Sequence, residues 1–336
     1  MNNFFIIFVI VILVSCNSDL EPKIFKQFQK FVKDYKKDYS SLNEYLSRYQ
    51  VFRNNLMKNT NSKKHSFKTG ITQFSDLTKK EFSQIYLNLD YNSIKDDNKI
   101  SFTSKRLKAA PPSFDWRDYG VVGPVPNQGY CTASWAFTTM GNLEGLYAIH
   151  EGEFKRFSAQ MLVDCDTGDS GCNGGLMEYS FNWLKKNGGL MLDSDYPYKG
   201  KKQTCKSDKT KYINMKVTGY IKLGSSTSTW SPVDEEEMKE FLYENGPLTI
   251  AMNANSLQEY TEGIIDVPDS ECPTSGINHA VLLVGYGVDS KSGLNYWIVQ
   301  NVWGESWGES GYFRIRRGNG TCGVNCYVVT GEVSFD

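Results

Sequence analysis

The hydrophobic positions in the first third of the chain recur with helical spacing. Two consecutive segments have apolar residues every three or four positions, at Ile24, Phe25, Phe28, Phe31, Val32 and Tyr35, and then at Tyr45, Tyr49, Phe52 and Leu56. This pattern predicts two amphipathic helices that pack together and against a partner surface. A third helical pattern runs from Trp135 to Ile149, with Ser134 at its entrance.

The pattern changes in the last third of the chain. Short apolar runs between turn residues predict β-strands at Leu248–Met252, Ala280–Val284 and Tyr296–Val299. The Ser- and Thr-rich tract from Gly224 to Pro232 predicts a loop, and the acidic run Asp234–Glu237 begins a short surface helix. Helices first and strands later indicate an α+β body in two lobes, with an active cleft between them.

A separate apolar run, Phe4–Val14, lies at the N-terminus. Its eleven residues are too few to cross a bilayer, and they fit a secretory signal peptide over residues 1–16. The residues Leu13-Val14-Ser15-Cys16 also fit a bacterial lipoprotein cleavage box, and an uncleaved membrane anchor is a third interpretation. We expect a protein that is secreted or delivered to lysosomes or endosomes.

Charge is distributed unequally along a chain whose net charge is −1. Residues 17–110 contain 19 Lys and Arg against 10 Asp and Glu, a net of +9, whereas residues 111–336 contain 18 against 28, a net of −10. This asymmetry predicts an attraction between the two parts, partly screened by salt, although solvated surface charge is the simpler explanation. The near-zero total gives no reason to expect a nucleic-acid partner.

Seven cysteines remain once the signal peptide is excluded. In a secreted chain this number predicts three disulfides and one unpaired thiol. Six cysteines allow fifteen pairings, so counting alone leaves the connectivity open.

The segment Gln128-Gly129-Tyr130-Cys131-Thr132-Ala133-Ser134-Trp135-Ala136-Phe137 carries the candidate chemistry. It resembles the active-site segment of papain-type cysteine peptidases, in which the position of Ser134 is the nucleophilic cysteine. The resemblance implies a papain-like two-lobe fold, with a helical lobe and a β-barrel-like lobe, preceded by a helical inhibitory propeptide. Gln128 corresponds to the oxyanion-hole donor, acting with the backbone N–H of Ser134. Because Ser is also a preferred N-cap, Ser134 has a purely structural interpretation as a helix cap.

Two further residues match the same family. His279 lies 145 positions after Ser134 and resembles the catalytic histidine, while Asn301, before Val302-Trp303-Gly304, resembles the asparagine that orients it. A lone His beside an apolar strand is usually a core residue, and a lone Asn usually a turn residue, but three matches in order argue against that. His65 and His150 match nothing.

The resemblance also assigns substrate-binding residues. Cys172-Asn173-Gly174-Gly175-Leu176-Met177 is similar to a cathepsin L-type rim, where glycines let the substrate backbone approach and the next two side chains line the specificity pocket; an ordinary tight turn is the alternative. The assigned residues are Gly174, Gly175, Leu176, Met177, Ala251, Asn278 and Tyr327, with Tyr327 at the pocket floor. Thr132, for the usual glycine, is expected near the leaving-group side, and Val302 replaces a serine.

The segment from Asn17 to about Ala110 resembles a papain-type propeptide, and the peptidase domain begins near Pro111. Its helical motif is matched at Glu44, Arg48, Phe52 and Asn55 but not at Asn59 and Lys63, and its second motif at Gly70, Phe74 and Asp76, with Thr72 for Asn. A helical hairpin unrelated to inhibition is the alternative. The domains expected are therefore 1–16, 17–110 and 111–336.

The family resemblance selects one disulfide pairing: Cys131–Cys172, Cys165–Cys205 and Cys272–Cys322. Cys326 is then an unpaired, buried thiol. The sequon Asn319-Gly320-Thr321 lies in a glycine-bearing loop and is expected to be exposed and glycosylated in a eukaryotic secretory pathway.

The serine determines how much activity to expect. A papain-type thiol is ionised because the helix N-terminus and the imidazolium lower its pKa from about 8.5 to roughly 3–4. An alcohol cannot be ionised this way and needs His279 as a general base, without the carboxylate that serine hydrolases use. We therefore weigh a weak Ser-dependent peptidase, a non-catalytic peptide- or inhibitor-binding pseudopeptidase, and a silicatein-like silica-condensing protein. The resemblance implies a monomer with no cofactor and no metal, whose partners are peptide or protein substrates, its own propeptide as an intramolecular inhibitor, and cystatin-like inhibitors.

Overall fold

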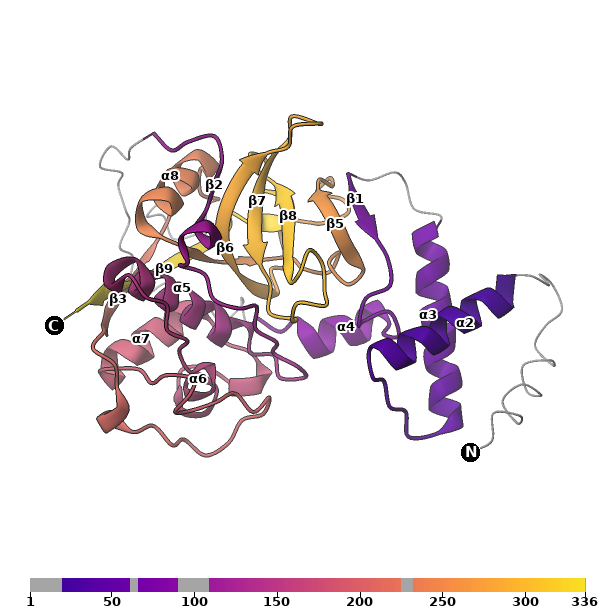
Figure 1. The fold of residues 1–336 in the computed structure, drawn as a ribbon, viewed down its shortest axis with the longest axis horizontal. Coiled ribbons are helices and arrows are strands. Elements are labelled where there is room, and N and C mark those ends of the chain that lie inside the picture. Colours follow the sequence, from indigo (N-terminus) through magenta and orange to yellow (C-terminus); the bar gives the residue numbers. More distant parts are fainter. Residues whose placement is uncertain (1–19, 61–65, 90–108, 225–231, 336) are drawn as a thin grey trace.

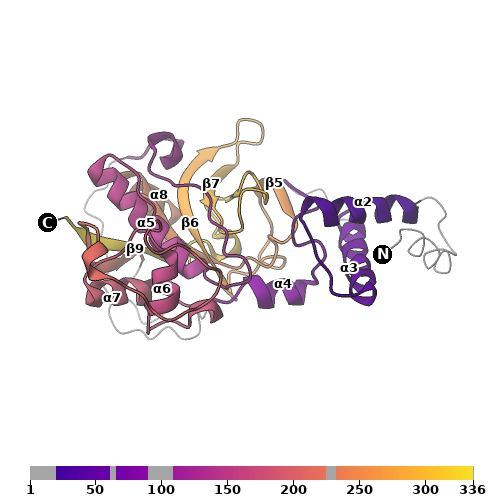
Figure 2. The ribbon, with the colours of Figure 1, turned by 60° about the horizontal axis from the view of Figure 1, so that its bottom comes forward.

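A computed structural model describes residues 20–60, 66–89, 109–224 and 232–335. The described part has an elongated shape, with two crossed helices at one end and a larger helix-and-sheet body at the other (Figures 1 and 2). The signal peptide, Lys63, His65 and most of the predicted 224–232 loop lie outside the described residues, as does the side chain of Asn59. Among the described residues, no helix has the length and apolar character needed to cross a bilayer.

The two predicted N-terminal helices are confirmed as α2 (Leu20–Asp34) and α3 (Leu42–Thr60). Their apolar faces meet in an aromatic cluster in which the rings of Phe28 and Phe52 lie 5.3 Å apart and both side chains are fully buried. The hydroxyl of Tyr49 on α3 donates to the Glu21 carboxylate on α2 at 2.7 Å. The helical spacing in the sequence therefore reflects one compact helix pair.

The residues of the two propeptide motifs tie α3 to the chain that follows it. Asn55 donates from its side-chain amide to the carbonyls of Ser75 and Leu77, and Arg48 forms an ion pair with Glu81 at 2.9 Å. Glu81 also completes a capping box at the start of α4 (Lys79–Tyr86). The motif thus fixes the direction in which α4 leaves the helix pair (Figure 1).

The first lobe of the body is mainly helical. The long helix α5 (Ser134–Glu151) confirms the predicted helix, and α6 (Ala159–Cys165) and α7 (Met177–Asn187) pack beside it. The described residues also contain short 3-10 helices, namely η3 (Trp116–Tyr119), η4 (Gly171–Asn173), η5 (Lys209–Lys211) and η6 (Thr321–Gly323). Most of α5 is buried, as a central helix requires.

The second lobe is built on a sheet in which the described strands follow the order β1-β5-β8-β7-β6-β4-β9-β3, with β2 paired to β6. The strands are β1 (Phe67–Thr69), β2 (Phe114–Asp115), β3 (Lys216–Lys222), β4 (Leu248–Met252), β5 (Tyr260–Ile265), β6 (His279–Val288), β7 (Asn295–Gln300), β8 (Tyr312–Arg316) and β9 (Tyr327–Ser334). All three predicted strands are found. The predicted acidic surface helix is α8 (Glu235–Asn245), whose first turn is capped by the Asp234 side chain.

Each lobe has its own buried cluster of apolar residues, and the propeptide contributes to both. Phe74, Phe82 and Leu87 belong to the cluster of the β-lobe, whereas Leu89 belongs to that of the helical lobe. The propeptide strand β1 also pairs antiparallel with β5 at the edge of the sheet (Figure 1). The chain is therefore an α+β protein in which the propeptide segment 86–89 passes from one lobe to the other.

Three disulfides stabilise the loops of the body. They join Cys131 to Cys172, Cys165 to Cys205 and Cys272 to Cys322, which are the pairs that the family resemblance implied. Cys326 is a free thiol and only partly buried, so the expectation of full burial was wrong. No cluster of His, Cys, Asp and Glu among the described residues has the arrangement of a metal site.

Candidate active site

Ser134 is the first residue of α5 and is only 5% exposed. The helix N-cap is Ala133, and no side chain caps the helix. The Ser134 hydroxyl instead accepts from the backbone N–H of Ala280 on β6, with an O–N distance of 3.4 Å. The N-cap interpretation of Ser134 was therefore wrong, and its side chain faces the β-lobe.

His279 and Asn301 are brought together by neighbouring antiparallel strands. His279 begins β6 and Asn301 follows the end of β7, which pairs with β6. The imidazole Nε2 lies 2.8 Å from Asn301 Oδ1, and the ring stacks on Trp303 with centroids 4.8 Å apart. An amide oxygen can only accept, so Nε2 carries the proton and Nδ1 carries a lone pair. Nδ1 has no hydrogen-bond partner among the described residues.

Burial decides the protonation state of this histidine. His279 is fully buried, which lowers its pKa to about 4, although the Asn301 hydrogen bond opposes the shift. The propeptide packs against the indole that stacks on this histidine, because the Phe74 and Phe82 rings lie 5.2 and 5.4 Å from the Trp303 ring. The imidazole is neutral at neutral pH in this propeptide-covered state.

Gln128 directs its side-chain amide at a peptide carbonyl. Its Nε2 donates to the backbone oxygen of Tyr86 in the propeptide at 3.4 Å, and its backbone N–H donates to Val302 O at 2.8 Å. The Tyr86 oxygen stands in for a substrate carbonyl at the predicted oxyanion-hole donor.

The rim that begins at Gly174 lies against the same propeptide segment. A Cβ on Gly174 would lie 2.1 Å from the Asn88 carbonyl oxygen, and Gly174 has a φ of +107°. Both the steric overlap and the backbone conformation therefore exclude a side chain at this position. Asn88 donates from its side-chain amide to Asn173 O at 2.6 Å. The next residue, Leu89, donates its N–H to Asn278 O at 3.2 Å. Both Gly174 and Asn278 therefore lie against the propeptide backbone, and their role in binding substrate stays a prediction.

Leu89 is the propeptide side chain buried at this point. It is 7% exposed and belongs to the buried cluster of the helical lobe, together with the predicted pocket residues Leu176, Met177, Ala251 and Tyr327. Tyr327 is fully buried, and burial raises the pKa of its phenol well above the ordinary value. Gly175 lies behind the rim, where a Cβ would overlap Asp169 and Trp135.

Two of the departures from the family pattern, Thr132 and Val302, lie beside the candidate site. Thr132 donates its backbone N–H and its hydroxyl to the carbonyl of Cys172, so its side chain lies against the rim. Val302 is buried and donates its N–H to Asn301 Oδ1 at 2.8 Å.

Sequence reasoning missed two parts of this site. The propeptide residues Tyr86–Leu89 were not expected to fill it, although the alternation of Leu87 and Leu89 with polar Asn88 is typical of an extended segment. The buried carboxyl groups of Asp166 and Asp169 behind the rim were also missed; their placement between bridged cysteines was the available signal.

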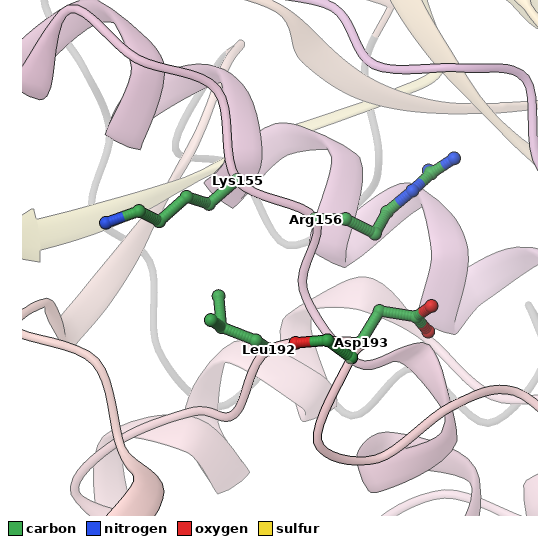
Figure 3. Close-up of a pocket in the computed structure, with 5 residues that line it drawn as sticks. Lys155, Arg156, Leu192 and Asp193 are labelled. Carbon is green, nitrogen blue, oxygen red and sulfur yellow. The ribbon is translucent and has the colours of Figure 1, made fainter.

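An open surface pocket of about 390 Å³ lies elsewhere on the helical lobe (Figure 3). Lys155, Arg156, Leu192, Asp193 and Ser194 line it. Its main cation is already used, because Arg156 donates to Pro124 O and lies 3.7 Å from the buried Glu144 carboxylate. None of the predicted site residues lies there.

The geometry agrees with comparisons to known proteins. A family model described as papain family cysteine protease matches residues 110–332. The chain belongs to the papain family. A second model, the cathepsin propeptide inhibitor domain, matches residues 28–82, so the N-terminal helices form a propeptide of the inhibitor type.

Similar proteins come from distant organisms. Cathepsin F of Drosophila melanogaster is 39% identical over 315 residues, which cover 90% of this chain but 49% of that protein, so the chain spans about half its length. Cysteine proteinase 1 of Dictyostelium discoideum is 35% identical over 348 residues, 97% of each chain. The solved digestive procathepsin L2 proteinase of Tenebrio molitor superposes with a TM-score of 0.83 at 31% identity, covering 92% of this chain and 99% of that one.

Proposed function

We propose that this papain-family protein is a zymogen whose peptidase domain hydrolyses peptide and ester bonds slowly, with Ser134 as nucleophile and His279 as general base. The observation that carries the proposal is the pair of hydrogen bonds that the peptidase domain forms with the propeptide backbone. Gln128 donates to the carbonyl of Tyr86, and Asn278 accepts from Leu89, beside an assembled His279–Asn301 pair. A binding site for extended peptide backbone and a polarised imidazole therefore lie together.

In the proposed reaction, Asn301 holds the Nε2 proton so that the Nδ1 lone pair removes the proton of the Ser134 hydroxyl during attack. Gln128 Nε2 and the backbone N–H of Ser134 stabilise the oxyanion. The imidazolium then gives its proton to the leaving amine, which leaves the acyl group as an ester on Ser134. Water hydrolyses this ester and restores the free hydroxyl. Asn301 is neutral and cannot stabilise the imidazolium as a carboxylate does, and the electropositive N-terminus of α5 destabilises it, so the reaction is slow.

Non-catalytic peptide binding is the second candidate. It is favoured by the Ser134 hydroxyl, whose hydrogen bond comes from Ala280 N–H and not from the imidazole. In this case the same rim and Gln128 bind a peptide or an inhibitor without cleaving it. The silica-condensing activity remains a prediction, with no contact in its favour.

The expected substrates are peptides with a leucine-sized side chain at the second position before the scissile bond. Leu89 is buried in the same apolar cluster as Leu176, Met177, Ala251 and Tyr327, which the family resemblance assigns to the specificity pocket. We further propose that the protein is a secreted or lysosomal monomer. Its signal peptide covers residues 1–16, and the boundary between propeptide and peptidase domain lies near residue 110. Cystatin-like proteins inhibit it, and the exposed Asn319 is glycosylated.

The test compares the propeptide-free protein with its Ser134→Ala and Gln128→Ala variants on an activated peptide ester and on the matching amide. Slow ester turnover that is lost in Ser134→Ala, and reduced about 10²–10³-fold in Gln128→Ala, supports the peptidase. Stoichiometric peptide binding with identical background hydrolysis in all three proteins supports the binding protein.

A further inference from the structure

Two buried aspartates lie behind the rim, in the loop between Cys165 and Cys172. Asp166 is 1% exposed and Asp169 8% exposed, and the Oδ2 atom of Asp166 is buried without a hydrogen-bond partner among the described residues. Two ionised carboxylates cannot form a hydrogen bond, because neither carries a donor. A hydrogen bond to the buried Asp166 Oδ2 from Asp169 therefore needs a proton on one of the two carboxyls.

The surroundings identify which carboxyl is protonated. Asp166 Oδ1 accepts the backbone N–H of Gly168 at 2.8 Å, and the charge of Lys202 favours the ionised form of Asp166. Asp166 Oδ2 is buried. If both carboxyls are ionised, no hydrogen-bond donor among the described residues reaches it. A proton on Asp169 supplies that donor. Burial, and then the Asp166 charge, raise the pKa of Asp169 to about 9.

Asp169 in turn holds the rim from behind. Its Oδ1 accepts the backbone N–H of Leu176 at 2.8 Å, and its Oδ2 lies 3.2 Å from the donating Ser180 hydroxyl. Gly175 leaves no room between them, since a Cβ there would lie 2.6 Å from Asp169 Oδ1. The opposite side of this rim contacts Asn88 through Gly174.

We propose that Asp169 is a positioning residue for peptide binding, which holds the rim at Gly174–Leu176 through a proton shared with Asp166. Loss of the proton places two like charges in one buried site, and the repulsion moves Asp169 off the Leu176 amide. Other titratable groups lie near the pair. The charge of Lys202 favours the ionised form of Asp166. The pKa of Tyr327 is raised by burial and by the charges of the buried Glu178 and of Asp169, so this phenol stays neutral. The role in binding rests on the proposed function, whereas the shared proton does not.

The test uses the full-length chain, in which the propeptide occupies the rim. Carbon-13 labels at the Asp carboxyl carbons report ionisation by NMR, and amide hydrogen exchange reports on Leu176 and Leu89. Asp169→Asn keeps a donor and an acceptor but cannot ionise. The matched control is Asp193→Asn, since Asp193 also has a pKa raised by burial but lies in the distant pocket with Arg156 (Figure 3).

In the unsubstituted chain we expect an aspartyl carboxyl that is still protonated at neutral pH and titrates at about 9. Its signal is lost in Asp169→Asn and kept in Asp193→Asn. Exchange at Leu176, corrected for its intrinsic pH dependence, rises roughly fivefold to tenfold through that titration, with a parallel rise at Leu89, and neither rise occurs in Asp169→Asn.

Ionisation of both Asp166 and Asp169 at neutral pH overturns the shared proton. A titration without any change at Leu176 and Leu89 overturns the positioning role. Neither readout involves Ser134 or turnover, so failure of the proposed hydrolysis, seen as no difference between the unsubstituted protein and Ser134→Ala, is a separate result.

Discussion

The side-chain amide of Gln128 donates to the backbone carbonyl of Tyr86, with an N–O distance of 3.4 Å. The propeptide carbonyl therefore occupies the donor that we propose for a substrate carbonyl, while Leu89 is buried in the apolar cluster next to the rim. Inhibition follows from occupancy of both positions by one four-residue segment, Tyr86–Leu89. Anchoring of the rest of the propeptide determines how firmly this segment is held.

Gly263 is the anchor most easily tested. A Cβ there would lie 2.7 Å from Phe67 Cα and 2.8 Å from Ser66 O, because β1 pairs directly against β5. Gly263→Ala should therefore weaken propeptide binding by about 1–3 kcal/mol beyond any backbone strain. Limited proteolysis of the full-length chain, followed as accelerated propeptide release, measures this effect.

Gly318 provides the control, since its φ of +107° resembles the +99° of Gly263 but no atom lies within 4 Å of its Cβ position. Gly318→Ala bears the same strain, about 1–2 kcal/mol, without touching the propeptide. Equal release rates in the two variants would show that the β1–β5 pairing does not anchor the propeptide.

The pKa of His279 links the propeptide to pH. Burial lowers this pKa to about 4 in the covered state, below the ordinary 6.5. A lowered histidine pKa means that the covered state is fully stable above about pH 6.5 and loses stability as the pH falls towards 4, because protonation favours the open state. We expect propeptide release to accelerate over this range. Proton NMR should resolve three histidine rings before propeptide removal and two after it, since His65 leaves with the propeptide, and the pKa of His279 should rise on removal; an unchanged pKa would exclude this linkage.

Charge asymmetry predicts a second, weaker dependence. The ion pair Lys68–Glu262 joins the propeptide to the body and is exposed, whereas the pairs Lys37–Asp76 and Arg48–Glu81 are internal to the propeptide. We expect the parts of +9 and −10 to attract each other at long range, with an attraction that salt screens. We expect added salt to lower the affinity of separately made propeptide, and Lys68→Ala to change it little. An affinity indifferent to both salt and acidification would remove the electrostatic contribution.

The sequence predicted the features that depend on local pattern. The helices α2, α3 and α5 and the strand β4 follow from spacing and apolar runs, and the positions of Gln128, Ser134, His279 and Asn301 follow from family motifs. What it could not predict depends on contacts between distant segments. The Ser134 hydroxyl meets Ala280 across the two lobes, and Thr132 turns to the Cys172 carbonyl. Neither contact leaves a periodic signal in the sequence.

Ser134→Cys tests whether the surrounding groups suit a thiolate. The N-terminus of α5 and the polarised His279 should lower the pKa of the new thiol, so that the propeptide-free variant reacts with a small alkylating reagent faster than an ordinary thiol. The partly buried Cys326, whose pKa is raised by burial, is the internal reference. Adding His279→Ala should remove the advantage. If the thiol introduced by Ser134→Cys is no more reactive than that of Cys326, the site is not assembled for catalysis.

The central claim is that Ser134 acts as a nucleophile beside His279. Intact-mass spectrometry of the propeptide-free protein, quenched in acid during reaction with an activated ester of a peptide carrying leucine at the second position before the scissile bond, tests it most directly. We predict a covalent acyl adduct that maps to Ser134 and is absent in Ser134→Ala and in His279→Ala. Bound peptide without any adduct on Ser134, at every reaction time, would contradict it.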